Sequence, residues 1–329
     1  MNYYLKKNTA IFFYFFFIFF SLTYSILHGE GFYGYNIDYY EEYRKNNLRI
    51  KLQLDLIIFD SLGLYFATLT LFNKHIGVHV TSFMLAFSSG MLIKKFLEIR
   101  KVYSTINFFF IYLLVLHIHP LIMSNSGAMR QGFVMSFLFL SFYAWLSEFK
   151  KISFLFLLTG VFFHKSGPII FLIFIITFFF NLVLDKVKNK KFISILFALF
   201  SFFFFYYIFK IIFEGKSTRV VYGDFRLPWF VLNSLYILLF FYYNKLFLSS
   251  KFRFIITYSY ILVSINPIFL LLDLNDQYER MNMIMGVIYV LVFGLIFKRK
   301  YYLVVISILF LIYFYLTVKQ GMYTIGLTN

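Results

Sequence analysis

The chain contains no cysteine and few charged residues, and both shortages limit what it can be. Without cysteine there can be no disulfide, no thiolate metal site and no cysteine nucleophile. Only 14% of the 329 residues are charged, whereas a soluble protein carries about a quarter. Apolar residues make up 61% of the chain and aromatic residues 25%. The composition therefore predicts a polytopic integral membrane protein that is surrounded mostly by lipid.

The patterns of several metal-dependent and nucleotide-dependent enzymes are also missing. The chain has no HExxH motif, no DxD motif and no Gly-rich phosphate-binding loop. His117 and His119 are two residues apart, so on a helix their side chains would point in different directions. We therefore predict no metal site, no cofactor and no nucleotide hydrolysis.

Eleven apolar runs predict membrane-crossing helices. A span needs about 20 apolar residues, and an isolated strand would leave backbone groups unpaired in lipid. The runs cover 8–27, 78–93, 104–122, 132–147, 152–164, 168–184, 192–213, 227–244, 254–272, 281–297 and 301–318. A weaker run at 56–72 contains Asp60, which is costly at membrane depth, so this run is predicted to be re-entrant or interfacial. We expect an all-α fold with a single transmembrane domain over residues 1–329.

Basic clusters between the runs predict the orientation, because cytoplasmic loops carry an excess of Lys and Arg. If 56–72 does not cross and the N-terminus is cytoplasmic, the inside loops hold most of the basic residues and the outer loops are nearly neutral. The inside clusters are Lys6–Lys7, Lys94–Lys101, Lys150–Lys151, Lys186–Lys191, Lys245–Arg253 and Lys298–Lys300. The net charge of +17 is therefore a topology signal, and it gives no reason to expect nucleic acid as a partner.

Four of the arginines on the predicted outer loops, which cover about 28–55, 123–131, 214–226 and 273–280, are candidates for binding an anion. They are Arg130, Arg219, Arg226 and Arg280. A guanidinium group matches the paired oxygens of a phosphate or carboxylate, although an outer arginine can also pair with a nearby acid or a lipid phosphate. Arg130 is the strongest candidate, since it opens an apolar helix where its charge opposes the helix dipole. There its side chain can join free backbone N–H groups in facing an anion.

His164 is the second candidate. It follows the short run 152–163, which as a helix would extend only about 18 Å, against about 30 Å for the bilayer core. We therefore expect His164 and Lys165 to lie below the membrane surface. A neutral histidine there could take a proton from a sugar hydroxyl or donate to a phosphate, or it could only satisfy a helix end.

Two motifs give a family resemblance. Met129-Arg130-Gln131-Gly132 opens one helix, and Phe162-Phe163-His164-Lys165-Ser166-Gly167 ends the short one. Together they resemble the "LRQG" and "FH-x-S-A" motifs of the EpsG family of Wzy-type polysaccharide polymerases. Asp38-Tyr39-Tyr40-Glu41-Glu42-Tyr43 and Tyr278-Glu279-Arg280 are similar to that family's first outer loop and C-terminal arginine. The chain departs from the pattern at Met129, Gly167 and Asp60-Ser61, where the family has Leu, Ala and Glu-Pro.

The resemblance implies an enzyme with a GT-C-like polymerase architecture in the inner (cytoplasmic) membrane of a bacterium. It would join undecaprenyl-diphosphate-linked oligosaccharide repeat units at the outer face of the lipid bilayer, with a chain-length regulator and a repeat-unit flippase as partners. The implied catalytic residues are Arg130, His164, Arg280 and Asp38. The implied substrate-binding residues are Gln131, Lys165, Arg219, Arg226, Tyr39, Tyr43 and Tyr278.

Two other interpretations stay open. A transporter or flippase of lipid-linked glycans would also use intramembrane charge and an arginine-lined cavity. It would be expected to show internal repeats and polar groups on both sides, whereas the chain has no detectable repeat and its candidate groups are biased to the outer face. A membrane O-acyltransferase of polysaccharide would need His and Arg near the first helices, where only His28 stands.

Overall fold

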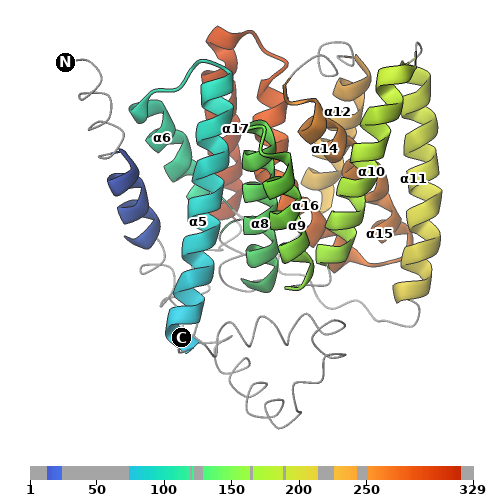
Figure 1. Ribbon diagram of the computed structural model, residues 1–329, viewed down its shortest axis with the longest axis horizontal. Coiled ribbons are helices and arrows are strands. Elements are labelled where there is room, and N and C mark those ends of the chain that lie inside the picture. The colour runs from blue at the N-terminus through green and yellow to red at the C-terminus, as the bar shows by residue number, and fades with distance from the viewer. Residues whose placement is uncertain are drawn as a thin grey trace. The chain divides into compact units, whose positions relative to one another are not determined.

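The computed structural model describes residues 13–23, 74–118, 121, 129–163, 166–187, 190–213, 226–242 and 251–319 (Figure 1). All regular secondary structure in these ranges is helical, so the predicted all-α fold is confirmed. Each of the eleven predicted apolar runs contains a helix. The weaker run at 56–72 and the predicted outer loop at 28–55 lie outside the described residues.

Five helices of the described part are long and apolar enough to cross a membrane, as expected of an integral membrane protein. They are His79–Ile99 within α5, Ser166–Lys186 (α10), Phe192–Ile211 within α11, Arg253–Leu271 (α14 and α15) and Arg299–Lys319 (α17). These helices differ in how far the rest of the protein covers them. In their most apolar stretches, 78% of Arg253–Leu271 is buried but only 22% of Phe192–Ile211. The exposed apolar side chains of α11 therefore suit contact with lipid, which is as apolar as they are.

The helices form two compact units. The first, residues 1–168 and 299–329, contains Phe13–Thr23, α5 (Lys74–Ile99), α6 (Thr105–Leu116), α8 (Met129–Leu146), α9 (Lys150–Val161) and α17. The second, residues 169–298, contains most of α10 together with α11 (Lys190–Phe213), α12 (Arg226–Tyr242), α14 (Arg253–Ile265), α15 (Pro267–Leu271) and α16 (Asn275–Gly294).

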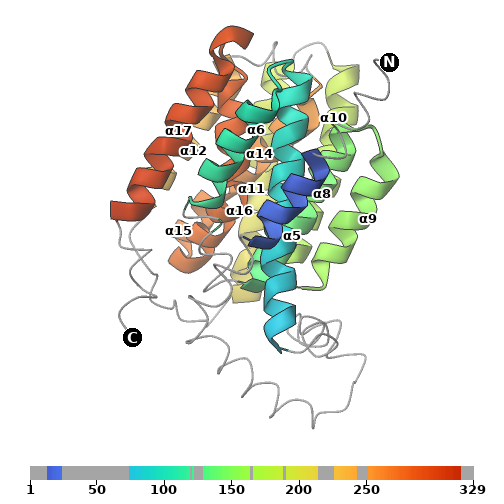
Figure 2. The same ribbon diagram turned by 90° about the vertical axis from the view of Figure 1, so that its left-hand side faces the viewer.

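The first described helix packs against α5 and α6 through one face (Figure 2). Its buried residues Phe13, Phe17 and Ser21 are four apart, so they lie on one side of the helix. The Phe17 ring meets Phe108 of α6 edge-on, with 5.5 Å between the ring centroids. The Ser21 hydroxyl lies 2.8 Å from the Tyr112 hydroxyl. Later residues of the first helix contact later residues of α6, so the first helix runs parallel to α6.

Gly90 of α5 makes room for the same helix. A Cβ atom at Gly90 would lie 2.4 Å from the Phe17 ring, so only glycine lets the ring come this close to the α5 backbone. Phe13 lies farther along α5, where the Lys94 ammonium group is 5.7 Å from its ring centroid. Phe13 therefore contacts a later part of α5 than Phe17 does, so the first helix and α5 are antiparallel. The segment 24–73 is therefore flanked by two helix ends on the same side of the first unit.

Basic residues from two distant parts of the chain gather at one end of the first unit. Lys94 forms an ion pair with Glu98, and its ammonium group lies 5.4 Å from the Tyr103 ring centroid. The Arg299 guanidinium group donates hydrogen bonds to the Lys101 carbonyl oxygen, which is 3.1 Å from Nε. The end of α5 and the start of α17, two of the predicted inside clusters, therefore lie together.

Helix α14 forms the core of the second unit. The Tyr258 hydroxyl donates to the Ile170 carbonyl of α10 at 3.2 Å, and the Tyr260 hydroxyl donates to the Ser194 carbonyl of α11 at 3.2 Å. The Tyr260 ring also stacks on Phe240 of α12, with 3.9 Å between centroids. A buried tyrosine hydroxyl is costly without a partner, and main-chain carbonyls of neighbouring helices supply one here.

A proline interrupts the span that α14 and α15 share. Pro267 has no N–H group to donate to the carbonyl of Val263, four residues earlier in the chain. Asn266, between the two helices, keeps helical dihedrals with φ −53° and ψ −39°. The helical path therefore continues through the interruption, although one backbone acceptor has lost its helical donor.

Three helix ends use the same turn with a residue other than glycine in the left-handed region. Lys101, Glu148 and Asp273 have φ angles of 55°, 69° and 55°. After Asp273, the Leu274 N–H donates to the Phe269 carbonyl at 2.7 Å, as in a Schellman motif. Each of the three residues carries a conformational cost of about 1 kcal/mol that glycine would avoid.

Candidate functional site

The hairpin of α8 and α9 carries the first predicted motif. Phe133 and Phe137 of α8 contact Phe163, which follows α9, with 4.5 and 5.5 Å between ring centroids. Nearer the turn between the helices, the Ser141 and Ser153 hydroxyls are 2.9 Å apart. The two helices are therefore antiparallel, and the first turns of α8 lie beside the end of α9.

Arg130 is the second residue of α8 and stands one turn before Phe133. Gln131 is fully buried, so its amide lies inside the first unit rather than on its surface. His164 and Lys165 lie outside the described residues and directly follow Phe163 in the sequence. The hairpin thus brings the helix start that contains Arg130 next to the chain position that precedes His164.

The start of α10 touches the end of α9 at Gly167. A Cβ atom there would lie 2.7 Å from the Gly160 carbonyl oxygen and 2.8 Å from the Val161 Cα. Both atoms belong to the backbone, so the alanine of the resembling motif would force the chain to shift. Glycine at this position allows α10 to begin directly against the end of α9.

The start of α16 carries the second motif, Tyr278-Glu279-Arg280. Tyr278 is 1% exposed, and its hydroxyl accepts a hydrogen bond from Asn233 Nδ2 of α12 at 3.3 Å. The ring therefore packs between helices and offers no open face on which a sugar could stack. Glu279 is 4% exposed, which buries a carboxylate at this helix start, while Arg280 is half-buried.

Three asparagines join Tyr278 in a polar group, here termed the asparagine cluster: Asn233, Asn266, Asn282 and Tyr278. Asn282 Nδ2 donates to the Tyr278 carbonyl at 2.8 Å. Asn282 Oδ1 accepts hydrogen bonds from Asn233 Nδ2 and Asn266 Nδ2, both at 2.9 Å. The cluster connects α12, α16 and the junction of α14 with α15, and Figure 1 shows these helices side by side.

The orientation of the amides follows from these bonds. Asn282 gives its nitrogen to a backbone carbonyl, so it can present only its oxygen to the other two asparagines. Asn233 and Asn266 must then present nitrogen, and their own oxygens face elsewhere. Both Oδ1 atoms are buried and receive no hydrogen bond within the described ranges. A buried acceptor without a donor costs about 1–3 kcal/mol, so the two oxygens require an explanation.

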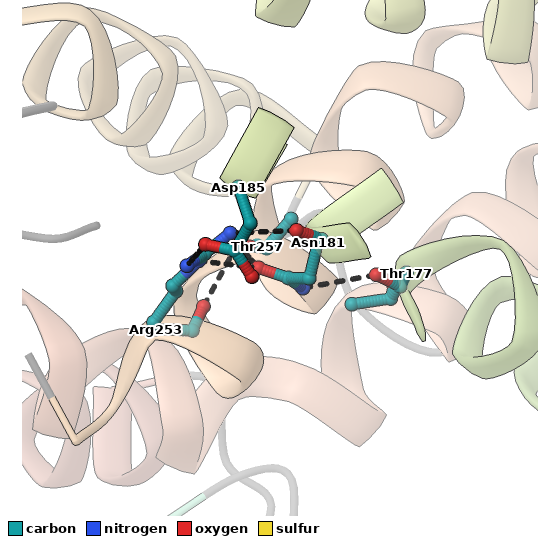
Figure 3. A network of polar contacts seen from close by, with 5 residues as sticks. All are labelled: Thr177, Asn181, Asp185, Arg253 and Thr257. Carbon is teal, nitrogen blue, oxygen red and sulfur yellow. Dashed lines mark hydrogen bonds and ion pairs between the residues drawn. The ribbon is translucent and has the colours of Figure 1, made fainter. Parts of the chain in front are cut away.

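A second polar group, here termed the Arg253 network, joins the end of α10 to the start of α14 (Figure 3). Arg253 Nε donates to Asn181 Oδ1 at 2.8 Å, Nη2 to the Asn181 carbonyl at 2.7 Å and Nη1 to Asp185 Oδ1 at 2.5 Å. Asn181 Nδ2 in turn donates to the Thr177 carbonyl at 2.9 Å, and the Thr257 hydroxyl to the Arg253 carbonyl at 2.8 Å. Every guanidinium nitrogen is thus bonded, and the network holds two helix ends together.

The other predicted site residues divide between the units or fall outside the described ranges. Arg226 is the first residue of α12. Arg130 and Gln131 belong to the first unit, whereas Arg226, Tyr278 and Arg280 belong to the second. The predicted residues outside the described ranges are Asp38, Tyr39, Tyr43, His164, Lys165 and Arg219. The convergence of both motifs on one substrate stays a prediction.

Metal-binding side chains are sparse in the part of the chain that the structure describes. No group of three or more His, Asp or Glu residues there could hold a metal ion. His75 and His79 in α5 have the i, i+4 spacing of a metal-binding pair, which the sequence prediction overlooked. In comparisons with known proteins, the chain matches no family model, no curated protein and no solved structure.

The asparagine cluster was not predicted from the sequence, although a signal was present. Asn233, Asn266 and Asn282 each stand inside an apolar run. An amide in such a run is costly unless it is bonded, so each of the three indicates a polar contact between helices or a site.

Proposed function

We propose that the protein is a polysaccharide polymerase of the EpsG/Wzy type, which joins undecaprenyl-diphosphate-linked oligosaccharide repeat units. The observation that carries the proposal is the contact between Phe133 and Phe163, at 4.5 Å between ring centroids. It brings the helix start with Arg130 beside the chain that leads to His164, and so supports a site built from both parts of the motif. A helical membrane protein also suits a substrate whose carrier is a long prenyl chain.

In the proposed reaction, the glycan of one lipid carrier is transferred to the glycan of another. The acceptor hydroxyl oxygen attacks the anomeric carbon of the donor, and the bond from this carbon to the diphosphate oxygen breaks. The lipid diphosphate leaves with the bonding electrons, while the hydroxyl proton passes to His164 or Asp38 as base. Arg130 stabilises the negative charge that develops on the diphosphate, a role that the resemblance also implies for Arg280. The leaving group is already activated, so the step needs no nucleotide.

We further infer a GT-C-like arrangement of about eleven transmembrane helices with a cytoplasmic N-terminus in a bacterial inner membrane. Two findings support this orientation. The end of α5 and the start of α17, both basic, lie together, as Lys and Arg do on a cytoplasmic face. The first helix and α5 are antiparallel, which is required if 56–72 does not cross the membrane.

Replacing Arg130 by Ala tests the proposal. The variant should make no polymer and accumulate single repeat units on the lipid carrier, because a charge that stabilises the leaving group is lost. Removal of one such donor typically slows an enzyme by about 100-fold or more. Arg130→Lys should restore little, since an ammonium group makes no bidentate contact. The readout is the length of the glycan made by a strain that carries the chain, with the amount of protein in the membrane measured alongside.

Lys151→Ala is the matched control, because Lys151 is an exposed basic residue at the opposite end of the same hairpin. It should make polymer of normal length. Normal polymer in the Arg130→Ala strain, at a normal protein level, would overturn the proposal.

A transporter or flippase of lipid-linked glycans is the second candidate, and one observation favours it. The proline-interrupted span beside buried amides resembles the discontinuous helices that form substrate sites in transporters. The two functions separate in detergent micelles, which have no two sides. A polymerase still lengthens lipid-linked glycans there, whereas a flippase does not.

A further inference from the structure

The asparagine cluster leaves two acceptors that turning over one amide does not satisfy without breaking another bond of the cluster. Asn233 is 4% exposed and Asn266 is fully buried, and each gives its nitrogen to Asn282 at 2.9 Å. Turning either amide over would face its oxygen to the Asn282 oxygen, and a hydrogen bond would become a repulsion. The two oxygens therefore need an occupant that is electropositive and small enough to be enclosed.

We propose that Asn233 Oδ1 and Asn266 Oδ1 bind a monovalent cation, Na⁺, in the interior of the second unit. Hard cations prefer oxygen ligands, including amide and backbone carbonyl oxygens. The Val263 carbonyl is a third ligand, because Pro267 provides no N–H for it. A helical side chain covers the turn N-terminal to its own Cα, which places the Asn266 amide over the turn that contains Val263. Unwound membrane helices coordinate Na⁺ through free backbone carbonyls, and Pro267 frees one such carbonyl here while the path stays helical.

Charge favours a monovalent ion over a divalent one. Glu279 is 4% exposed and stands three residues before Asn282 on α16, so the two residues share a helix face. A divalent ion would need more acidic ligands, and the described residues contain no cluster of three or more acids or histidines.

The test uses the purified full-length protein and compares its thermal unfolding in sodium, potassium and choline chloride at equal ionic strength. A bound ion stabilises the folded state by RT ln(1 + [ion]/Kd), so stability keeps rising with the logarithm of the ion concentration above Kd. The unfolding temperature should begin to rise once Na⁺ exceeds its Kd, rise less with K⁺ and not rise with choline. In Asn266→Ala, the Na⁺ concentration at which the rise begins should increase by about tenfold or more, because a ligand worth one factor of ten in affinity is lost.

Asn181→Ala is the matched control, because it removes a bonded asparagine of the same unit that belongs to the Arg253 network. It should lower the unfolding temperature and leave the Na⁺ dependence unchanged. Binding of radioactive sodium to the unmodified protein gives a second measurement, which remains valid if a variant fails to fold. It should saturate at one ion per chain.

Equal unfolding temperatures in all three salts, or sodium binding that does not saturate, would overturn the proposal and leave water as the occupant. The measurement uses no glycan, so its outcome does not depend on the proposed polymerase activity.

Discussion

The Arg253 network and the asparagine cluster both lie in the second unit and both contain asparagine, yet they use their polar atoms differently. Arg253 bonds through all three guanidinium nitrogens, and Asn181 uses both the oxygen and the nitrogen of its side chain. Asn233 and Asn266 use only their nitrogens within the described residues. In the Arg253 network, all guanidinium nitrogens bond to atoms of α10. In the asparagine cluster, two buried amide oxygens accept no hydrogen bond within the described residues.

The surroundings explain why the two arrangements can coexist. The Asp185 side chain is 59% exposed, so water can hydrate any acceptor of the Arg253 network that is not bonded. The asparagine cluster is buried, and its oxygens have no such access. A buried oxygen that accepts no hydrogen bond therefore indicates a bound ligand more strongly than such an oxygen near the surface.

The largest effect in this comparison is expected for Asn282→Leu. The substitution removes the acceptor of two buried N–H groups, which leaves Asn266 without its partner and Asn233 with only the Tyr278 hydroxyl. The free energy of unfolding in detergent should fall by about 3 kcal/mol, since each stranded polar group costs about 1–3 kcal/mol. An unchanged free energy of unfolding would mean that water bonds to the amides. The asparagine cluster would then be hydrated like the Arg253 network.

A smaller loss is expected for Arg253→Ala. Asp185 can be hydrated, so mainly the two hydrogen bonds to Asn181 are lost, and the free energy of unfolding should fall by about 2 kcal/mol. Arg253→Lys should recover part of the loss, because lysine keeps the charge but lacks the forked geometry. The same denaturation measurement ranks all three variants. A larger loss for Arg253→Ala than for Asn282→Leu would reverse the comparison.

The smallest change in the free energy of unfolding is expected at Glu148, which is far from both polar groups in the sequence. Glu148 has φ 69°, so Glu148→Gly should raise the free energy of unfolding by about 1 kcal/mol. Lys151→Gly, three residues later inside α9, should lower it by about 1 kcal/mol. If both substitutions change the free energy of unfolding with the same sign, the measurement does not resolve backbone effects of about 1 kcal/mol. The larger differences could then not be compared with each other.

Apolar runs predicted where helices form, but polar contacts decided where they end. The run predicted at 78–93 is part of a helix that continues to Ile99, because Lys94 pairs with Glu98 one turn later. The run predicted at 104–122 gives a helix that begins after Ser104, whose hydroxyl accepts from the Asn107 N–H at 3.1 Å. Hydropathy averages over such residues, so it misses helix ends that depend on individual hydrogen bonds.

The candidate site was predictable only where its residues are neighbours in sequence. Tyr278 and Arg280 stand together in one motif, whereas Asn233 comes from α12, Asn282 from α16 and Asn266 from the junction of α14 with α15. Each asparagine alone is a polar residue in an apolar run. Their shared hydrogen bonds depend on how α12, α14 and α16 are aligned with one another, and a single sequence does not specify that alignment.

The docking of the first helix at Gly90 has a consequence for biogenesis. Ser21 and its partner Tyr112 are 91 residues apart, so at common translation rates the ribosome needs about 5–20 seconds to make the rest of the docking surface. Until then the helix enters the bilayer without its partners. The Ser21 hydroxyl also donates to the Phe17 carbonyl of its own helix at 2.9 Å. This internal bond satisfies the hydroxyl in lipid, so the nascent helix can wait there without an exposed donor.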